Sequence, residues 1–276
     1  MVIDVHTHLH PPKLFAAIRR WFMDNPGWKL DHETDPASVA ETLRQNGVER
    51  FVFSSYAHRP GMARDLNAWL IEAAKSIDFY GLPMFTVHPD DPSYVENAAI
   101  ALEAGCVGLK IHEDVQAFGV DDERLSVIYS MLEERSAYML AHIGPIPWKV
   151  VTEKGFARVH SVLKKHPKLR FLVAHMGAPD TRNYLPLLAE FPGLYLDTTM
   201  AFFQFSKEYL PLSPDEVEAH AGRIVYGSDY PTTPYPYGRE LNHFRAMNLS
   251  AATLDAILHG NATRLLSPLM KNATLR

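Results

Sequence analysis

The stretch Val2-Ile3-Asp4-Val5-His6-Thr7-His8 combines β-branched residues with two histidines at its end. Such a run predicts a buried β-strand whose last residues are polar. Side chains two positions apart share one face of an extended chain, so His6 and His8 are expected to reach the same point in space. Taken alone, this pair is weak evidence for a metal site, because two histidines at a solvated strand end are a common alternative.

Short apolar runs of this kind recur along the whole chain and predict strands. They lie at 2–5, 50–54, 84–87, 107–111, 138–142, 169–175, 194–197 and 223–227. Apolar residues at helical spacing predict helices between them, at 36–45, 63–76, 94–104, 123–134, 156–165 and 181–190, with a closing helix at 258–270. Eight right-handed β-α-β units of this kind can close into a (β/α)8 barrel, which we predict as one domain over residues 1–276.

Polar residues stand where most of these predicted strands end. Lys110 and His112 end the fourth strand, His142 the fifth, His175 the sixth and Asp229 the eighth. A closed barrel brings the carboxyl ends of all its strands to one face, which an open doubly wound sheet, the rival architecture, does not. Neutral imidazoles and a carboxylate gathered on that face suit Zn²⁺ or a similar divalent cation. The sequence therefore favours an α/β barrel with a metal site at its mouth.

Composition narrows the classes of function. The 276 residues carry a formal net charge of −5, which offers no basic field to a nucleic acid, so a small-molecule substrate is the expected partner. No apolar stretch approaches the length of a membrane span, so no membrane partner is expected. Cys106 is the only cysteine; no intrachain disulfide can form, and a cytoplasmic location is expected. The oligomeric state is left open, a homo-oligomer included.

Six segments, taken in their order along the chain, resemble the amidohydrolase superfamily. They are His6-x-His8, GLKIH around Lys110, AHIG around His142, AHMG around His175, GSDYP around Asp229, and GNATRLL at 260–266. The chain is similar to the compact branch of the superfamily that includes aminocarboxymuconate-semialdehyde decarboxylase. The run GLKIHED of this chain, at 108–114, also resembles a segment of urease. The resemblance implies a (β/α)8 barrel and a metal-dependent enzyme.

The same resemblance implies a set of metal ligands for one or two divalent ions, for which Zn²⁺ is the expected metal. His6, His8, His142 and Asp229 would ligate the deeper ion. His175 would be either a ligand of a second ion or a general acid/base. Asp229 would also act as a proton shuttle, because it could bind metal through one oxygen and hold a proton on the other.

Lys110 and His112 receive their roles from the urease-like segment. A carboxylated Lys110 would bridge two ions as an anionic carbamate, as in binuclear members of the superfamily. An unmodified Lys110 would instead neutralise a substrate carboxylate. His112 would hydrogen-bond the substrate carbonyl group.

Other residues are expected at the rim of the barrel, where they could contact a substrate. Arg59 follows the second strand, Trp148 the fifth and Arg182 the sixth. Either arginine could clamp a substrate carboxylate, or be an ordinary solvated charge. Asp197 ends the seventh strand and could touch substrate or satisfy loop amides; the sequence leaves both readings open.

Three functions follow, of which hydrolysis is the one we predict. Metal-activated water is suited to attack a carbonyl carbon, and so to cleave a C–N or C–O bond in a small amide, lactone or ester. The alternative is nonoxidative decarboxylation of a small carboxylic acid, which dependence on Arg59 or Arg182 would favour. A non-enzymatic metal-binding protein is the third.

Overall fold

The computed structural model describes residues 1–78, 80–143, 155–202 and 212–273. Its strands are β1 (Val2–His8), β2 (Val48–Ser54), β3 (Gly81–Pro83), β4 (Gly108–His112), β5 (Tyr138–His142), β6 (Arg170–Val173), β7 (Leu194–Asp197) and β8 (Ile224–Val225). They pair in parallel in two ladders, β1-β2-β3 and β4-β5-β6-β7-β8.

Backbone contacts at both edges join the two ladders into one ring. Phe85, just after β3, forms a parallel bridge with Leu109 of β4. On the other side, the backbone N–H of Val5 in β1 donates to the carbonyl of Tyr226, directly after β8, at 3.0 Å. The sheet is therefore closed, and the predicted (β/α)8 barrel is confirmed.

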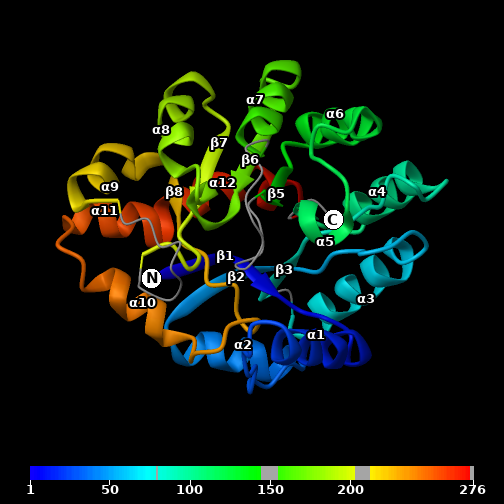
Figure 1. Cartoon of the computed structure of the whole chain (residues 1–276), viewed down its shortest axis with the longest axis horizontal. Coiled ribbons are helices and arrows are strands. Elements are labelled where there is room, and N and C mark those ends of the chain that lie inside the picture. The colour runs from blue at the N-terminus through cyan, green and yellow to red at the C-terminus, as the bar shows by residue number, and fades with distance from the viewer. Residues whose placement is uncertain (79, 144–154, 203–211, 274–276) are drawn as a thin grey trace.

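Helices surround the strands (Figure 1). They are α1 (Pro12–Asp24), α2 (Pro36–Gln45), α3 (Ala63–Ser76), α4 (Tyr94–Glu103), α5 (Glu113–Gln116), α6 (Ser126–Arg135), α7 (Gly155–Lys165), α8 (Thr181–Glu190), α9 (Pro214–His220), α10 (Gly238–Arg245), α11 (Ala251–Asp255) and α12 (Asn261–Ala273). Short turns of helix are η1 (Glu123–Leu125), η2 (Ala174–Gly177), η3 (Ala221–Arg223) and η4 (Ala256–Gly260). The predicted helices are present; α1, α5, α9, α10 and α11 were not predicted. No helix in these ranges is long and apolar enough to cross a membrane.

The third strand lies earlier than predicted. The sequence places it at 84–87, whereas the ladder with β2 uses Gly81–Pro83. The apolar run that follows is still buried, and it carries the Phe85 bridge to β4. The apolar pattern therefore predicted the approximate position of β3, whereas pairing with β2 determines which residues form the ladder.

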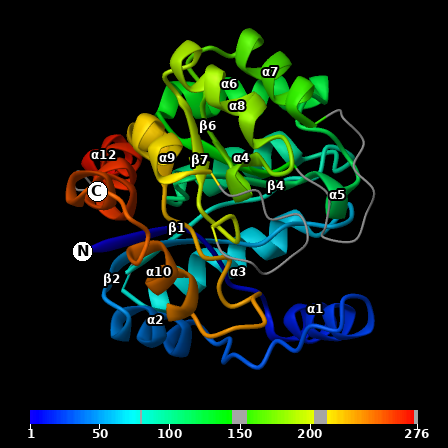
Figure 2. The ribbon, with the colours of Figure 1, turned by 60° about the vertical axis from the view of Figure 1, so that its left-hand side comes forward.

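Two apolar clusters fill the inside of the barrel and the layer under the helices. Val5, Leu140 and Leu172 belong to the inner cluster, whereas Met139, a neighbour on β5, packs outward in the larger cluster under the helices. α12 lies beside β1 (Figure 2) and adds Leu265 to the inner cluster. This alternation is the period-2 pattern of strands that are buried on both faces.

The inward positions become polar at the carboxyl ends of the strands. On β4 they are Gly108, Lys110 and His112, because Leu109 and Ile111 face the outer cluster. Asp197 follows in the same way on β7. One end of the barrel is thereby lined by titratable side chains from several strands, as barrel enzymes require.

Replacing Gly108 by alanine is expected to lower the free energy of unfolding by about 1–3 kcal/mol, the usual cost of overpacking. An added Cβ would meet the carbonyl oxygen of Tyr138 and the methyl group of Met84, so β4 and β5 would have to separate. Urea denaturation measures the change. Gly222→Ala is the matched control, because no atom lies within 4 Å of its added Cβ; it should change stability by less than about 0.5 kcal/mol. Equal stability of both variants would contradict this packing.

Candidate active site

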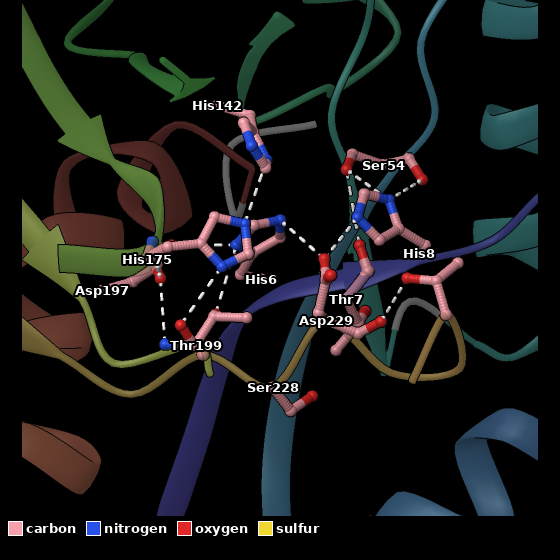
Figure 3. Close-up of polar contacts among 12 residues, drawn as sticks. His6, Thr7, His8, Ser54, His142, His175, Asp197, Thr199, Ser228 and Asp229 are labelled. Atoms are coloured by element: carbon pink, nitrogen blue, oxygen red, sulfur yellow. Dashed lines mark hydrogen bonds and ion pairs between the residues drawn. The ribbon is translucent and has the colours of Figure 1, made fainter. Parts of the chain in front are cut away.

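Two strand ends that are far apart in sequence meet at the mouth of the barrel (Figure 3). His6 and His8 end β1, and Asp229 follows β8. Asp229 Oδ1 lies 2.8 Å from His8 Nε2 and 3.2 Å from His6 Nε2. Both rings are buried, and the Asp229 side chain is 16% exposed. The sequence expectation that His6 and His8 reach one point is met, with Asp229 Oδ1 at that point.

His175, in the turn η2 directly after β6, joins this group. Ligand atoms of His6, His175 and Asp229 all lie within 4.8 Å of one another, a spacing that could hold a metal ion. His142 Nδ1 lies 3.0 Å from His175 Nε2 rather than against Asp229. The structure thus brings all the expected ligands together, but it groups His175, not His142, most tightly with His6 and Asp229. The assignment of His142 to the deeper ion stays a prediction.

Oxygen acceptors from other segments of the barrel lie against the Nδ1 atom of three of these rings. His6 Nδ1 lies 2.9 Å from Asp197 Oδ2 and His8 Nδ1 3.2 Å from the carbonyl oxygen of Ser54. His175 Nδ1 lies 3.2 Å from a third oxygen, the carbonyl of Thr199. Because these oxygens accept and do not donate, each Nδ1 carries the proton and, in a neutral ring, each Nε2 presents a lone pair to the site.

Burial keeps several of these groups in their neutral form. Burial, followed by the charge of Lys110, lowers the pKa of His6 to about 4. Burial also lowers the pKa of His112 and His142 well below the usual value. For Asp229 burial acts in the opposite direction, but the hydrogen bond to His8 and the nearby histidine charges outweigh it and hold its pKa well below the usual range.

These protonation states fit a bound divalent cation. His6 Nε2 and Asp229 Oδ1 face each other at 3.2 Å, both as acceptors. An uncharged His8 would bring a third acceptor atom against the same oxygen. Lone pairs that face each other in this way repel unless a proton or a cation lies between them. Imidazole nitrogen with carboxylate oxygen is a donor set that binds transition metals.

Lys110 reaches into the same cluster from β4. Its side chain is 1% exposed and Nζ lies 2.9 Å from His6 Nε2. Burial lowers its pKa to about 8, against the opposing effect of Asp229 and Asp197. Within the described ranges no carboxylate oxygen lies within 4.0 Å of Nζ. Burying an ammonium without a carboxylate partner costs free energy, so the position of Lys110 favours the binding of an anion beside it.

His112 and Tyr56 form one wall of the site. The ring of His112 stacks on that of His142, with centroids 4.0 Å apart and planes 7° apart. Its Nδ1 is buried without a hydrogen-bond partner in the part of the chain that the structure describes. Tyr56 packs edge-on against His112 at 5.2 Å and against His8 at 5.9 Å. Its place after β2 is its only sequence signal, and it was not predicted.

The expected rim residues are not gathered with the histidines. Arg182, at the start of α8, is exposed and forms an ion pair with Glu216 of α9 at 3.0 Å. Arg59 is exposed in the loop after β2. Among the described residues neither arginine contacts the cluster. Trp148 lies outside the described residues.

Asp197 is the residue whose role the sequence left open between substrate and loop amides. It accepts from the backbone N–H of His175 at 2.9 Å and of Thr199 at 3.1 Å, so the loop-amide reading is correct. It also holds the ring of His6. Its position after a buried apolar run on β7 was the available signal. Nothing in the sequence pointed to the carbonyl groups of Ser54 and Thr199.

A family model described as amidohydrolase matches residues 3–267. The chain belongs to this amidohydrolase family. The family resemblance seen in the sequence is thereby confirmed, and the match spans the segments that carry His6, Lys110 and Asp229.

Solved structures confirm the barrel fold of this amidohydrolase. An uncharacterised TIM-barrel protein from Bordetella bronchiseptica aligns with TM-score 0.75 and 19% identity, over 98% of this chain and 99% of its own. A 2,6-dihydroxybenzoate decarboxylase in complex with 2,6-dihydroxybenzoate aligns with TM-score 0.73 and 16% identity, over 96% and 99%. A 5-carboxyvanillate decarboxylase from Novosphingobium aromaticivorans, with bound manganese, aligns with TM-score 0.64 and 15% identity, over 97% of each chain. A search of curated proteins found no match.

Proposed function

We propose that this amidohydrolase is a metal-dependent, nonoxidative decarboxylase of a small carboxylic acid, most simply an aromatic one. Two kinds of support lead to this choice over hydrolysis. Similar solved structures include decarboxylases of 2,6-dihydroxybenzoate and 5-carboxyvanillate. The observation that carries the proposal is the buried, carboxylate-free ammonium of Lys110 at the centre of the histidine cluster.

His6, His8 and Asp229 would hold the cation, and the contacting pair His142 and His175 would supply a further nitrogen. A divalent cation there would polarise a bound carboxylate or carbonyl group. Mn²⁺ is the first metal to test, because a similar decarboxylase was crystallised with manganese; Zn²⁺, the metal expected from the sequence, is the second.

Lys110 gives the substrate carboxylate a counter-charge. Decarboxylation requires a carboxylate held in a fixed orientation, and the two arginines expected for this task lie outside the cluster. Lys110 Nζ is instead directed at His6, inside the group of ligands. A charge-assisted hydrogen bond from a desolvated ammonium is strong as well as directional.

The reaction breaks the bond between the carboxylate carbon and its neighbour. The electron pair stays on the neighbouring carbon, CO2 leaves, and that carbon takes one proton. Asp229 is our candidate to relay the proton. Its Oδ1 is directed at the two histidines of β1, whereas Oδ2 has no partner in the described part of the chain. Oδ2 can therefore accept a proton from solvent or substrate and return it to carbon.

The direct test offers the Mn²⁺-loaded protein a panel of aromatic acids that includes 2,6-dihydroxybenzoate and 5-carboxyvanillate. Each acid carries ¹³C in its carboxyl group, and the gas phase is analysed by mass spectrometry. We expect ¹³CO2 from at least one acid, and one solvent deuterium at the former carboxyl position in D2O. Absence of ¹³CO2 across the panel, together with turnover of lactones or amides, would overturn the proposal.

Hydrolysis of a small amide, lactone or ester is the second candidate, and it depends on a carboxylated Lys110 in place of the ammonium. A carboxylated Lys110 beside His6 could share two cations, with His142 and His175 as ligands of the second. Metal content separates the two candidates. Two ions per chain after reconstitution with bicarbonate would support the hydrolase, and one ion per chain the decarboxylase.

A further inference from the structure

The carboxylate of Asp197 contacts two of the candidate ligands, the ring of His6 and the backbone of His175. Asp197 ends β7 and is fully buried. Its Oδ2 lies 2.9 Å from His6 Nδ1, while Oδ1 accepts from the backbone N–H groups of His175 and Thr199 at 2.9 and 3.1 Å. Figure 3 shows Asp197 beside His175. Thr199 also contacts both rings, through Oγ1 to His6 Nδ1 at 3.3 Å and through its carbonyl oxygen to His175 Nδ1 at 3.2 Å, and Asp197 accepts from its backbone N–H.

Two independent contacts specify the tautomer of His6. The carboxylate of Asp197 accepts hydrogen bonds, so the facing Nδ1 carries a proton. The ammonium of Lys110 only donates, and it lies 2.9 Å from Nε2, so Nε2 must carry the lone pair. Both contacts require the same tautomer, and this tautomer is the one that can ligate a cation through Nε2.

The second oxygen of Asp197 orients His175. The backbone of His175 is in the left-handed region at φ 56°, which costs a non-glycine residue about 1–3 kcal/mol. Its N–H is held there by Asp197 Oδ1. The same oxygen holds the N–H of Thr199, whose carbonyl oxygen contacts His175 Nδ1 at 3.2 Å. Asp197 therefore orients both the backbone and, through Thr199, the ring of His175.

We infer that Asp197 is the positioning residue of this site, which presents the lone pairs of His6 Nε2 and His175 Nε2 to one cation. The inference rests on the metal-binding part of the proposed function and adds a residue to which the sequence gave no catalytic or ligand role. Carboxylates in contact with a metal-bound histidine commonly raise metal affinity about 10- to 100-fold.

Asp197→Asn separates this role from a structural one. The amide oxygen can still accept from His175 and Thr199, which directs the amide N–H₂ group to His6 Nδ1. If the amide were flipped, its oxygen would accept from His6 Nδ1, but the hydrogen bonds from the backbone N–H groups of His175 and Thr199 would both be lost. An N–H₂ group donates, so the proton of His6 must move to Nε2, where it blocks the cation. The variant is expected to fold, and to bind Mn²⁺ about 10- to 100-fold more weakly.

Three measurements test this inference. Ring ¹⁵N shifts of the metal-free protein report the His6 tautomer, isothermal titration reports Mn²⁺ affinity, and thermal unfolding reports the fold. Thr198→Val is the matched control. Thr198 follows Asp197 in the chain, and its hydroxyl group forms buried hydrogen bonds with the backbone of Gly227 but contacts no histidine. This variant should keep the Mn²⁺ affinity of the wild type. A wild-type protein that binds no Mn²⁺ or Zn²⁺ overturns the proposed function. Tight wild-type binding that Asp197→Asn leaves unchanged, with the proton still on Nδ1, overturns only the role of Asp197.

Discussion

Asp229→Asn is expected to lower turnover by about 10²–10⁴-fold while the protein keeps much of its bound metal. The range is the usual contribution of general acid–base catalysis. Asparagine retains a carbonyl oxygen that can take the place of Oδ1 between His6 and His8. It has no basic site near neutral pH, so it cannot relay a proton. Steady-state kinetics on an acid that passes the CO2 test, with elemental analysis of the same sample, measure both effects.

His175→Asn is the necessary comparison for that experiment. His175 lies in the same group of ligand atoms and contacts His142, so it is the other candidate for proton transfer. Loss of turnover in His175→Asn with full metal content, together with loss of metal in Asp229→Asn, would assign the proton transfer to His175. An Asp229→Asn variant with near-normal turnover would show that Asp229 relays no proton.

Lys110→Met is expected to lower kcat/KM for the acid substrate by about 10- to 100-fold, the loss of one charged hydrogen bond. Methionine is of similar size and is compatible with the buried site. Mn²⁺ affinity should stay the same or rise, because an ammonium 2.9 Å from His6 Nε2 repels a cation at that nitrogen. Kinetics and isothermal titration on one preparation give both values.

A matched pair of inhibitors isolates the charge effect of Lys110. Benzoate should lose affinity for Lys110→Met, whereas phenol, which lacks the carboxylate, should not. The opposite pattern, with benzoate unaffected and one of two metal ions lost, is the behaviour of a carboxylated lysine ligand. That result would favour hydrolysis over decarboxylation.

The sequence was sufficient for the barrel because each strand is defined by its own apolar run. Val5, Leu140 and Leu172 fill the barrel whatever their exact partners are, so strand number and order could be predicted. The boundaries of β3 could not, because they depend on which residues pair with β2. Pairing is a contact between segments and leaves no local pattern in either of them.

The same limit applies to the site. The spacing of His6 and His8, and the polar ends of later strands, predicted which side chains meet. Their tautomers depend on acceptors that other strands bring in, such as the carbonyl of Ser54. Arg182 was a candidate to clamp a substrate carboxylate, but at the surface it pairs with Glu216, 34 positions away. Long-range partners thus decide how a residue with the right chemistry is used.

Diffraction from crystals soaked in Mn²⁺ tests the central claim, that these side chains converge on one catalytic cation. Anomalous density should appear at the mouth of the barrel, within bonding reach of His6 Nε2, His8 Nε2 and Asp229. The Lys110 side chain should be unmodified. Density elsewhere on the surface, or an empty mouth with the His6 and His8 rings pointing apart, would contradict the account.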